Sequence, residues 1–477
     1  MLKTLKTRIL PKLKKVLPLI IAVFLAGAVF VPSMLPGALA NNIWSIEAIK
    51  YVFDEDSPNQ QLSRPPTHHP HGSIWVNRVD PLKPAVQAVP PQVEDVNEDD
   101  SGESSLDALV DGLTNYGEIQ SLDVQAKGLF QQGQYAQAIS IWQSIGQKAA
   151  LAEAASEASS FGITSLAIQA YQALYALDPQ RYALALSRAY ETNDEDAQAL
   201  AVLQDALQAY PGASQRESWQ IKQGDLYRAT ADWTQADATY QAILDENPLA
   251  SGAWIGLGWL AYQRDQDLPQ AISNLETAIA IAPQSGNGYL AMANLRSQAG
   301  QKDLAVEWYR QALERERDKP NYHLAYAKAL QADGQTAAAL AEYQSMVTRF
   351  PNYASGYYHQ AWAYHLAGQP QQAINAIETA LAVNPIPNIA YYTRADRIYQ
   401  SNQLPQKSQD LFKAGEKAFQ EIIDSFPDFP ESYLQMASFY EAFSQTDQAL
   451  EAYQTALTLD PDNQSAQQGL ERLAGDA

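Results

Sequence analysis

Residues 321–351 read NYHLAYAKALQADGQTAAALAEYQSMVTRFP, and this stretch decides the fold. Its first half carries apolar residues at helical spacing, which predicts a helix with one apolar face: Tyr322, Tyr326, Ala329 and Leu330. Asp333 and Gly334 then break the helix, since glycine tolerates the left-handed conformation that ends one. A second apolar run follows, and Pro351 ends it because proline lacks the N–H and clashes inside a helix. The stretch therefore predicts two helices joined by a tight turn.

The same two-helix pattern recurs along most of the chain. Prolines stand at intervals close to 34 residues or twice that, with one wider gap: Pro179, Pro211, Pro248, Pro283, Pro351, Pro385, Pro427 and Pro461. Twelve residues before most of them stands an alanine, where paired helices must approach closely: Ala167, Ala199, Ala236, Ala339, Ala373 and Ala449. About ten such units fit between residues 119 and 463. A fixed period of this length is typical of a stack of identical helical units.

This period resembles that of the tetratricopeptide repeat, whose pattern places Trp, Leu-Gly, Tyr, Ala, Phe and Pro at set offsets. Trp254, Leu257 and Gly258 reproduce the opening of that pattern. Most of the remainder is reproduced by Gly224, Tyr227, Ala236, Tyr240 and Pro248. The resemblance implies an all-α, right-handed solenoid of about ten tandem helix-turn-helix repeats. It also implies that the first helix of each pair lines a concave groove.

Two departures from the regular period carry information. The unit at residues 386–426 is longer than the others by about eight residues, and we expect the extra length near residues 401–409. After the last unit, residues 464–473 have the polar composition of the capping helix that keeps a solenoid soluble.

The chain of 477 residues is acidic and contains no cysteine. Its formal net charge is −22, and residues 41–477 alone carry 26 basic and 54 acidic side chains, or −28. Such a body repels nucleic acid and anionic lipid, so we expect neither as a partner of the array. Solubility of a long scaffold explains this charge, and basic partners or cations would also suit it. The lack of cysteine excludes a disulfide framework, a cysteine-ligated zinc site and a cysteine nucleophile.

The first 40 residues predict a membrane-targeting segment. They hold six basic and no acidic side chains, and residues 16–31 form an apolar run. A single transmembrane anchor and a signal peptide both have this composition. Ala38, Leu39 and Ala40 follow the pattern of a cleavage site. We expect an anchor with a cytoplasmic N-terminus and an extracytoplasmic array; the alternative is cleavage after Ala40 and a secreted or periplasmic protein.

These features divide the chain into four predicted parts. A basic N-terminus with an anchor or signal peptide occupies residues 1–40, and an acidic, Pro-rich linker occupies residues 41–117. The solenoid follows at residues 118–463, and the capping helix at residues 464–477.

No cluster in the sequence has the marks of a catalytic, metal or cofactor site. His68, His69 and His71 lie close together, but a Pro-rich linker offers none of the rigid frame and second shell that catalytic zinc needs. Phosphate-binding loops, HExxH and GxSxG are absent from the sequence. Acidic pairs fall at expected turns and helix ends, where they cap helices. We therefore expect no enzyme activity, no cofactor and no metal.

The resemblance places the functional surface in the groove. The inward positions of the first helices, carried over from the repeat pattern, include a partner-binding set that is largely aromatic: Trp259, Tyr262, Asn294, Lys328, Tyr358, Trp362, Tyr392 and Tyr399. Exposed rings of this kind hold apolar or Pro-rich peptide segments, or stack on sugars, although rings at such positions also pack between repeats. Asn294 and Lys328 alone do not complete the peptide-carboxylate clamp of some family members.

We therefore expect a non-catalytic scaffold that binds a segment of another protein in its groove. Its expected setting is the assembly of a membrane or envelope complex on the extracytoplasmic side. The alternative is an accessory protein that binds glycan and supports polysaccharide or cell-wall synthesis through the aromatic patch.

Overall fold

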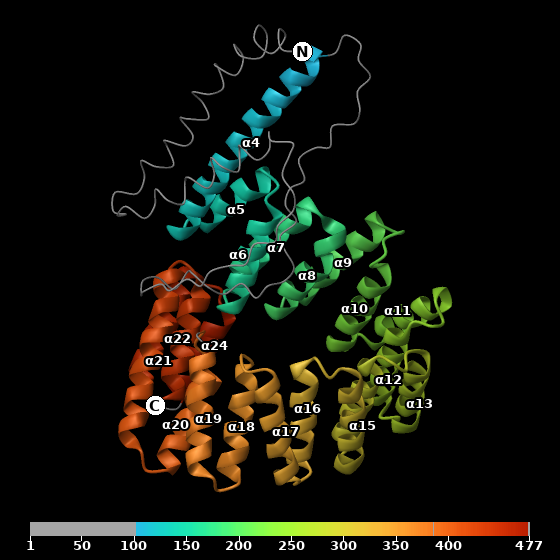
Figure 1. The fold of residues 1–477 in the computed structure, drawn as a ribbon, viewed down its shortest axis with the longest axis vertical. Coiled ribbons are helices and arrows are strands. Elements are labelled where there is room, and N and C mark those ends of the chain that lie inside the picture. Colours follow the sequence, from blue (N-terminus) through green and yellow to red (C-terminus); the bar gives the residue numbers. More distant parts are fainter. Residues whose placement is uncertain (1–101, 385, 476–477) are drawn as a thin grey trace, which may run out of the picture. The chain divides into compact units, whose positions relative to one another are not determined.

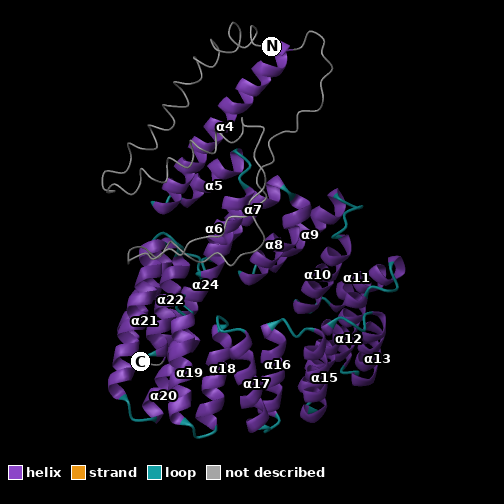
Figure 2. Ribbon diagram, viewed as in Figure 1, coloured by secondary structure: helices purple, strands orange, loops and turns teal. Residues whose placement is uncertain are grey.

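The computed structural model describes residues 102–384 and 386–475, and every regular element in this part of the chain is an α-helix (Figures 1 and 2). The helices form ten consecutive pairs followed by a single helix. The pairs are α4 (Gly102–Gln131) with α5 (Tyr135–Ser144), α6 (Lys148–Ser160) with α7 (Thr164–Leu177), α8 (Pro179–Thr192) with α9 (Asp196–Ala209), α10 (Arg216–Ala229) with α11 (Trp233–Glu246), α12 (Ser251–Asp265) with α13 (Leu268–Ile281), α14 (Gly286–Gln298) with α15 (Lys302–Arg315), α16 (Pro320–Ala332) with α17 (Thr336–Arg349), α18 (Ala354–Leu366) with α19 (Pro370–Val383), α20 (Ile389–Ser401) with α21 (Pro405–Ser425), and α22 (Pro430–Ala442) with α23 (Thr446–Leu459).

The chain is an all-α solenoid, as the period predicts. Each helix packs against its partner, and each second helix also packs against the first helix of the next pair. First helices also touch first helices of neighbouring pairs, as α10 does with α12 and α18 with α20. The first helices therefore lie together on one side of the stack and form the surface on which a groove was expected. The single helix α24 (Gln464–Gly475) packs on α23 at the end of the array, at the position predicted for the cap.

Prolines and glycines stand at the helix boundaries, as expected. Six of the periodic prolines that the structure describes stand two residues after the last residue of a second helix: Pro211, Pro248, Pro283, Pro351, Pro427 and Pro461. Pro179 follows α7 by the same distance and is also the first residue of α8, where a missing N–H costs nothing. Gly334 has a φ of +82° just after α16, which confirms its role as the residue that ends this helix.

Tyrosines that stand eight residues before a proline fill the space between pairs. Tyr240 on α11 is 0% exposed, and its hydroxyl donates to Asp225 Oδ1 over 2.7 Å. Its ring lies against Gly224 on α10 and Gly256 on α12, where neither position has room for a Cβ. The glycines thus allow two first helices to close on one buried ring.

The unit made of α20 and α21 is longer than the others, as expected, but its extra residues lie in a helix rather than in a turn. The turn at residues 402–404 is short, and the additional residues extend α21 to 21 residues where other second helices have about 14. The insertion is therefore close to two extra helical turns at 3.6 residues per turn. It brings Phe412 and Phe419 against Phe439 of α22, with ring centroids 5.5 and 5.0 Å apart.

The first helix begins earlier than the predicted solenoid. α4 starts at Gly102, within the segment predicted as linker. In the sequence, Leu106, Leu109, Val110 and Leu113 follow helical spacing, and the acidic and Ser-rich composition around them obscured this signal. The predicted anchor or signal peptide and the histidine cluster of the linker lie outside the described residues. None of the helices in the described part of the chain combines the length and apolarity that crossing a bilayer requires.

The largest core cluster contains residues from both ends of the array. It combines α4 to α7, represented by Trp142 and Leu166, with α21 to α24, represented by Phe426 and Phe439. The intervening pairs bury smaller clusters of their own. The first two pairs are therefore packed against the last two, although more than 200 residues separate them in sequence.

Candidate functional site

Three successive first helices, α16, α18 and α20, carry a surface on which aromatic rings and cations alternate. We call it the cation–aromatic surface and define it by six residues: Lys328, Tyr358, His359, Trp362, Tyr391 and Arg394. Tyr358 and Tyr391 stack across α18 and α20, with ring centroids 4.6 Å apart and an angle of 16° between their planes. The guanidinium of Arg394 lies 3.7 Å from the centroid of the Tyr358 ring and 5.1 Å from that of Trp362.

Arg394 is half-buried, and its charge has no carboxylate partner. Its Nη1 donates to the backbone oxygen of Tyr358 over 3.4 Å. Burial lowers the pKa of the Arg394 guanidinium, and no carboxylate is among the groups whose charge shifts that pKa. The ion pairs within the described residues include neither Arg394 nor the exposed Lys328. In a chain with 54 acidic side chains, these two residues form a partly exposed positive patch without an ion pair.

The pKa of His359 reflects the positive charges on the same surface. Burial, together with the charges of Lys328 and Arg394, lowers the pKa of its imidazole to about 4. His359 is therefore neutral at physiological pH. Its ring meets the Tyr358 ring edge to face at 4.9 Å, so it supports the stack without adding a charge.

Trp362 provides the outer edge of the surface. Its indole stacks on His365, one turn further along α18, with centroids 4.8 Å apart. The guanidinium of Arg397, on α20, lies over the same indole, 5.7 Å from its centroid. Cations at these distances from an aromatic face interact favourably with it. Both arginines thus lie against aromatic rings, and the one hydrogen bond that Arg394 donates goes to a backbone oxygen rather than to a carboxylate.

The structure brings together only three of the eight residues predicted from the sequence: Lys328, Tyr358 and Trp362. Trp259 and Tyr262 lie on α12 and pack at the edge of the core that α12 shares with α13 and α14. Asn294, on α14, accepts a hydrogen bond of 2.5 Å from the Tyr309 hydroxyl.

Tyr392 and Tyr399 are occupied in packing. The Tyr392 ring lies 6.1 Å from Phe419 and 5.8 Å from Phe439. Tyr399 is 4% exposed, and its hydroxyl donates to Glu378 Oε1 over 3.2 Å. We leave both residues out of the site.

Tyr391, His359 and Arg394 were missed by the sequence reasoning. Arg394 follows Tyr391 by three residues, which places both on one face of α20. That spacing was available as a signal. That spacing did not predict the contact with Tyr358, which stands 33 residues before Tyr391 and 36 before Arg394.

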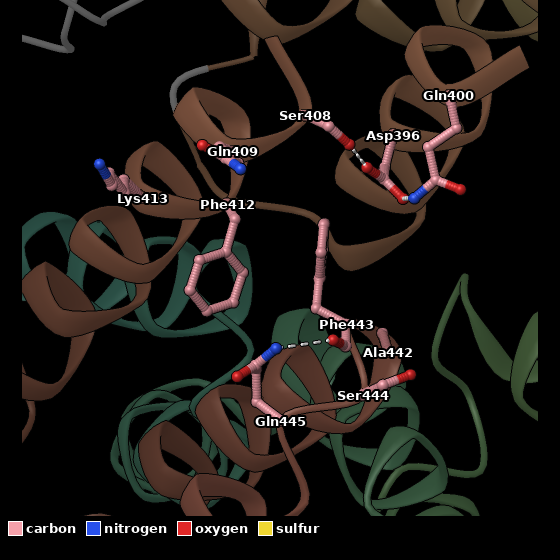
Figure 3. A pocket seen from close by; sticks show the side chains of 10 residues that line it. All are labelled: Asp396, Gln400, Ser408, Gln409, Phe412, Lys413, Ala442, Phe443, Ser444 and Gln445. Carbon is pink, nitrogen blue, oxygen red and sulfur yellow. Dashed lines mark hydrogen bonds between the residues drawn. The ribbon is translucent and has the colours of Figure 1, made fainter. Parts of the chain in front are cut away.

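A pocket of about 380 Å³ lies beside the irregular unit, between α20, α21 and the connection from α22 to α23 (Figure 3). Ser408 donates to Asp396 Oδ1, and Gln400 Nε2 donates to Asp396 Oδ2 over 2.6 Å. Burial raises the pKa of the Asp396 carboxyl. The Asp396 carboxylate is therefore already occupied by two hydrogen-bond donors of the pocket itself. The described residues also contain no group of three or more His, Asp or Glu side chains placed to hold a metal ion.

Models of the tetratricopeptide repeat family match this sequence in four places: residues 221–286, 262–329, 354–387 and 430–463. Comparison with curated proteins gave no match. Among solved structures, YrrB, described as a TPR protein with an unusual peptide-binding site, is 17% identical with a TM-score of 0.29; the alignment covers 39% of this chain and 94% of that one. The type IV pilus biogenesis factor PilW is 17% identical, with a TM-score of 0.36 over 44% of this chain and 96% of its own. A tetratricopeptide repeat protein from Parabacteroides merdae is 12% identical, with a TM-score of 0.34 over 62% and 98%.

Proposed function

Because the chain is a tetratricopeptide repeat protein, we propose that it is a non-catalytic scaffold that binds a segment of a partner protein on its first helices. The proposed contact is the cation–aromatic surface, and the proposed partner segment is acidic. Assembly of a membrane or envelope complex is the proposed setting.

One observation carries this proposal: Arg394 is half-buried, stacked on rings and unpaired. Burying a charge without a partner costs free energy, so a protein retains such a group where a ligand supplies the missing charge. A carboxylate fits a planar guanidinium, which can donate two parallel hydrogen bonds to it. Tyr358 and Trp362 would add flat apolar contact beside the ion pair.

The proposal is tested with the full chain and three sets of labelled peptides of equal length, which are acidic, neutral and basic. Fluorescence anisotropy should show the tightest binding for acidic peptides that contain an aromatic residue. Because the contact is electrostatic and partly exposed, its affinity should fall as salt rises from about 0.05 to about 0.5 M. Equal affinity for all three sets, or a preference for basic peptides, would contradict the proposal. Binding of an oligosaccharide that Trp362→Ala removes, without binding of any acidic peptide, would favour the glycan-binding alternative.

For the location of the array, we propose the extracytoplasmic side of a membrane, with residues 1–40 as a single anchor. The support is the basic and apolar composition of that segment. N-terminal sequencing of the mature protein tests it. We expect an intact N-terminus, whereas a start at Asn41 would replace the anchor by a cleaved signal.

A further inference from the structure

The two ends of the array meet in a contact that we call the clasp, and six residues define it: Tyr135, Phe161, Phe426, Phe429, Glu431 and Gln435. The Tyr135 ring stacks on Phe426 with centroids 5.5 Å apart and meets Phe429 at the same distance. Phe161 lies 5.6 Å from Phe426. The Tyr135 hydroxyl also donates to the backbone oxygen of Ser425. Aromatic rings from both ends thus form one cluster.

The polar half of the clasp caps a helix from the opposite end of the chain. α7 begins at Thr164, and the residue before it, Ile163, has no side chain that could cap it. Glu431 of α22 accepts instead, from Ser165 N over 2.9 Å and from Thr164 Oγ1 over 3.2 Å. A carboxylate is favourable at this position because the first N–H groups of a helix are unpaired and carry partial positive charge.

Gln435, one turn further along α22, satisfies the other side of the same turn. Its Nε2 donates to the backbone oxygen of Phe161, at the end of α6, over 2.8 Å. The turn between α6 and α7 therefore depends on α22 for hydrogen bonds at both of its ends. Glu431 and Gln435 supply these hydrogen bonds from positions 266 and 274 residues further along the sequence.

Several features make the clasp weaker than the joints between consecutive pairs. Consecutive helices pack along their length, whereas the ends meet through side chains at helix ends and turns. The second oxygen of the Glu431 carboxylate, Oε2, is buried without a hydrogen-bond partner, which is costly.

Negative charge also gathers at the clasp. Burial, together with the charges of Glu157 and Asp428, raises the pKa of Tyr135 to about 12. Burial, with Glu153 nearby, raises the pKa of Glu157 to about 7. No cation is among the groups that shift either pKa. Glu157 from one end of the array and Asp428 from the other therefore both act on the Tyr135 hydroxyl.

We propose that the clasp is a reversible latch, which holds the two ends of the array together and opens while the repeats remain folded. A solenoid distributes bending over many neighbouring joints, so small rotations at each joint can separate the ends without breaking any one joint. A partner segment that is not a free chain end would reach the first helices through the open form. This inference is independent of the cation–aromatic surface, because none of its residues belongs to the clasp.

Double electron–electron resonance tests the latch, and the chain suits the method because it has no native cysteine. Spin labels at the exposed positions Ser160→Cys on α6 and Gln420→Cys on α21 report the distance across the clasp. We expect a major short distance and a minor long one in the otherwise native chain. Glu431→Ala with Gln435→Ala should shift the population to the long distance, and Glu431→Gln should shift it less. Labels at Ser160→Cys and Asp205→Cys, which do not span the clasp, should change little.

Circular dichroism and hydrogen exchange complete the test. Helicity should stay unchanged in the double variant, while the amide of Ser165 should exchange faster because it loses its acceptor. A single short distance that both variants leave unchanged would overturn the latch. Separation of the ends that occurs only together with loss of helicity would also overturn it, because the clasp would then be part of the folded core.

Discussion

Arg394→Glu is expected to abolish the binding of acidic peptides by the full chain. The native guanidinium is already oriented by the Tyr358 ring, whose centroid lies 3.7 Å away. It forms no ion pair with a carboxylate of this chain that ligand binding would have to break. A hydrogen bond to a charged group contributes about 1.5–3 kcal/mol, which corresponds to a loss of roughly ten- to a hundredfold in affinity when it is removed. The new carboxylate also repels the ligand, so the total loss should exceed that range. Anisotropy titration at low salt measures it.

Two further variants make this result specific. Arg394→Lys keeps the charge and loses the planar stack, so we expect an affinity between those of the native chain and Arg394→Glu. Arg188→Glu is the matched control, because Arg188 is an exposed arginine on the first helix α8, far from the cation–aromatic surface in sequence. It makes the same change in net charge and should leave affinity nearly unchanged. Equal losses in both charge reversals would show that only net charge matters.

The period predicted the helices well because each boundary is set locally. A proline two residues beyond a second helix, or a glycine with positive φ after a first helix, acts within one turn of chain. The face that a residue occupies follows from the same period. Tyr392 stands 34 residues after Tyr358, and both lie on first helices.

The period does not predict which side chains pack against that face. Tyr358 meets Tyr391 and Arg394 of the next first helix. Tyr392 instead meets Phe439 of α22 and Phe419 of the extended helix α21. The site therefore depends on side chains from two different units, and a sequence pattern describes each unit separately.

The clasp was beyond prediction for a related reason. Tyr135 and Ser425 are 290 residues apart, and whether they meet depends on small rotations summed over the intervening pairs. No local sequence pattern determines the sum of these rotations. Ile163, the residue directly before α7, cannot cap it with its side chain, but Ala250 and Tyr353 stand in the same position before α12 and α18, so this feature does not predict a remote cap.

Gly256→Ala is expected to destabilise the array, although alanine is the better helix former. In an unrestricted helix this change stabilises by up to about 1 kcal/mol. At Gly256 an added Cβ would overlap the Tyr240 ring, which is itself fully buried and has Gly224 on its other side. Overpacking of a filled core costs about 1–3 kcal/mol, so the sign of the effect should reverse. Urea unfolding followed by circular dichroism should show a lower midpoint for this variant.

Gly128→Ala in α4 is the matched control, because no atom beyond the neighbouring residues and backbone of its own helix lies within 4 Å of the position that its Cβ would occupy. It should leave the midpoint unchanged or raise it. Combining Gly256→Ala with Tyr240→Leu should cost less than the sum of the two single changes, since the smaller side chain makes room for the methyl group. If Gly256→Ala raises the midpoint as Gly128→Ala does, Tyr240 is not confined between the two helices. Additive losses of stability would mean that Gly256 and the Tyr240 ring do not interact, and the close approach of α10 and α12 would then need another cause.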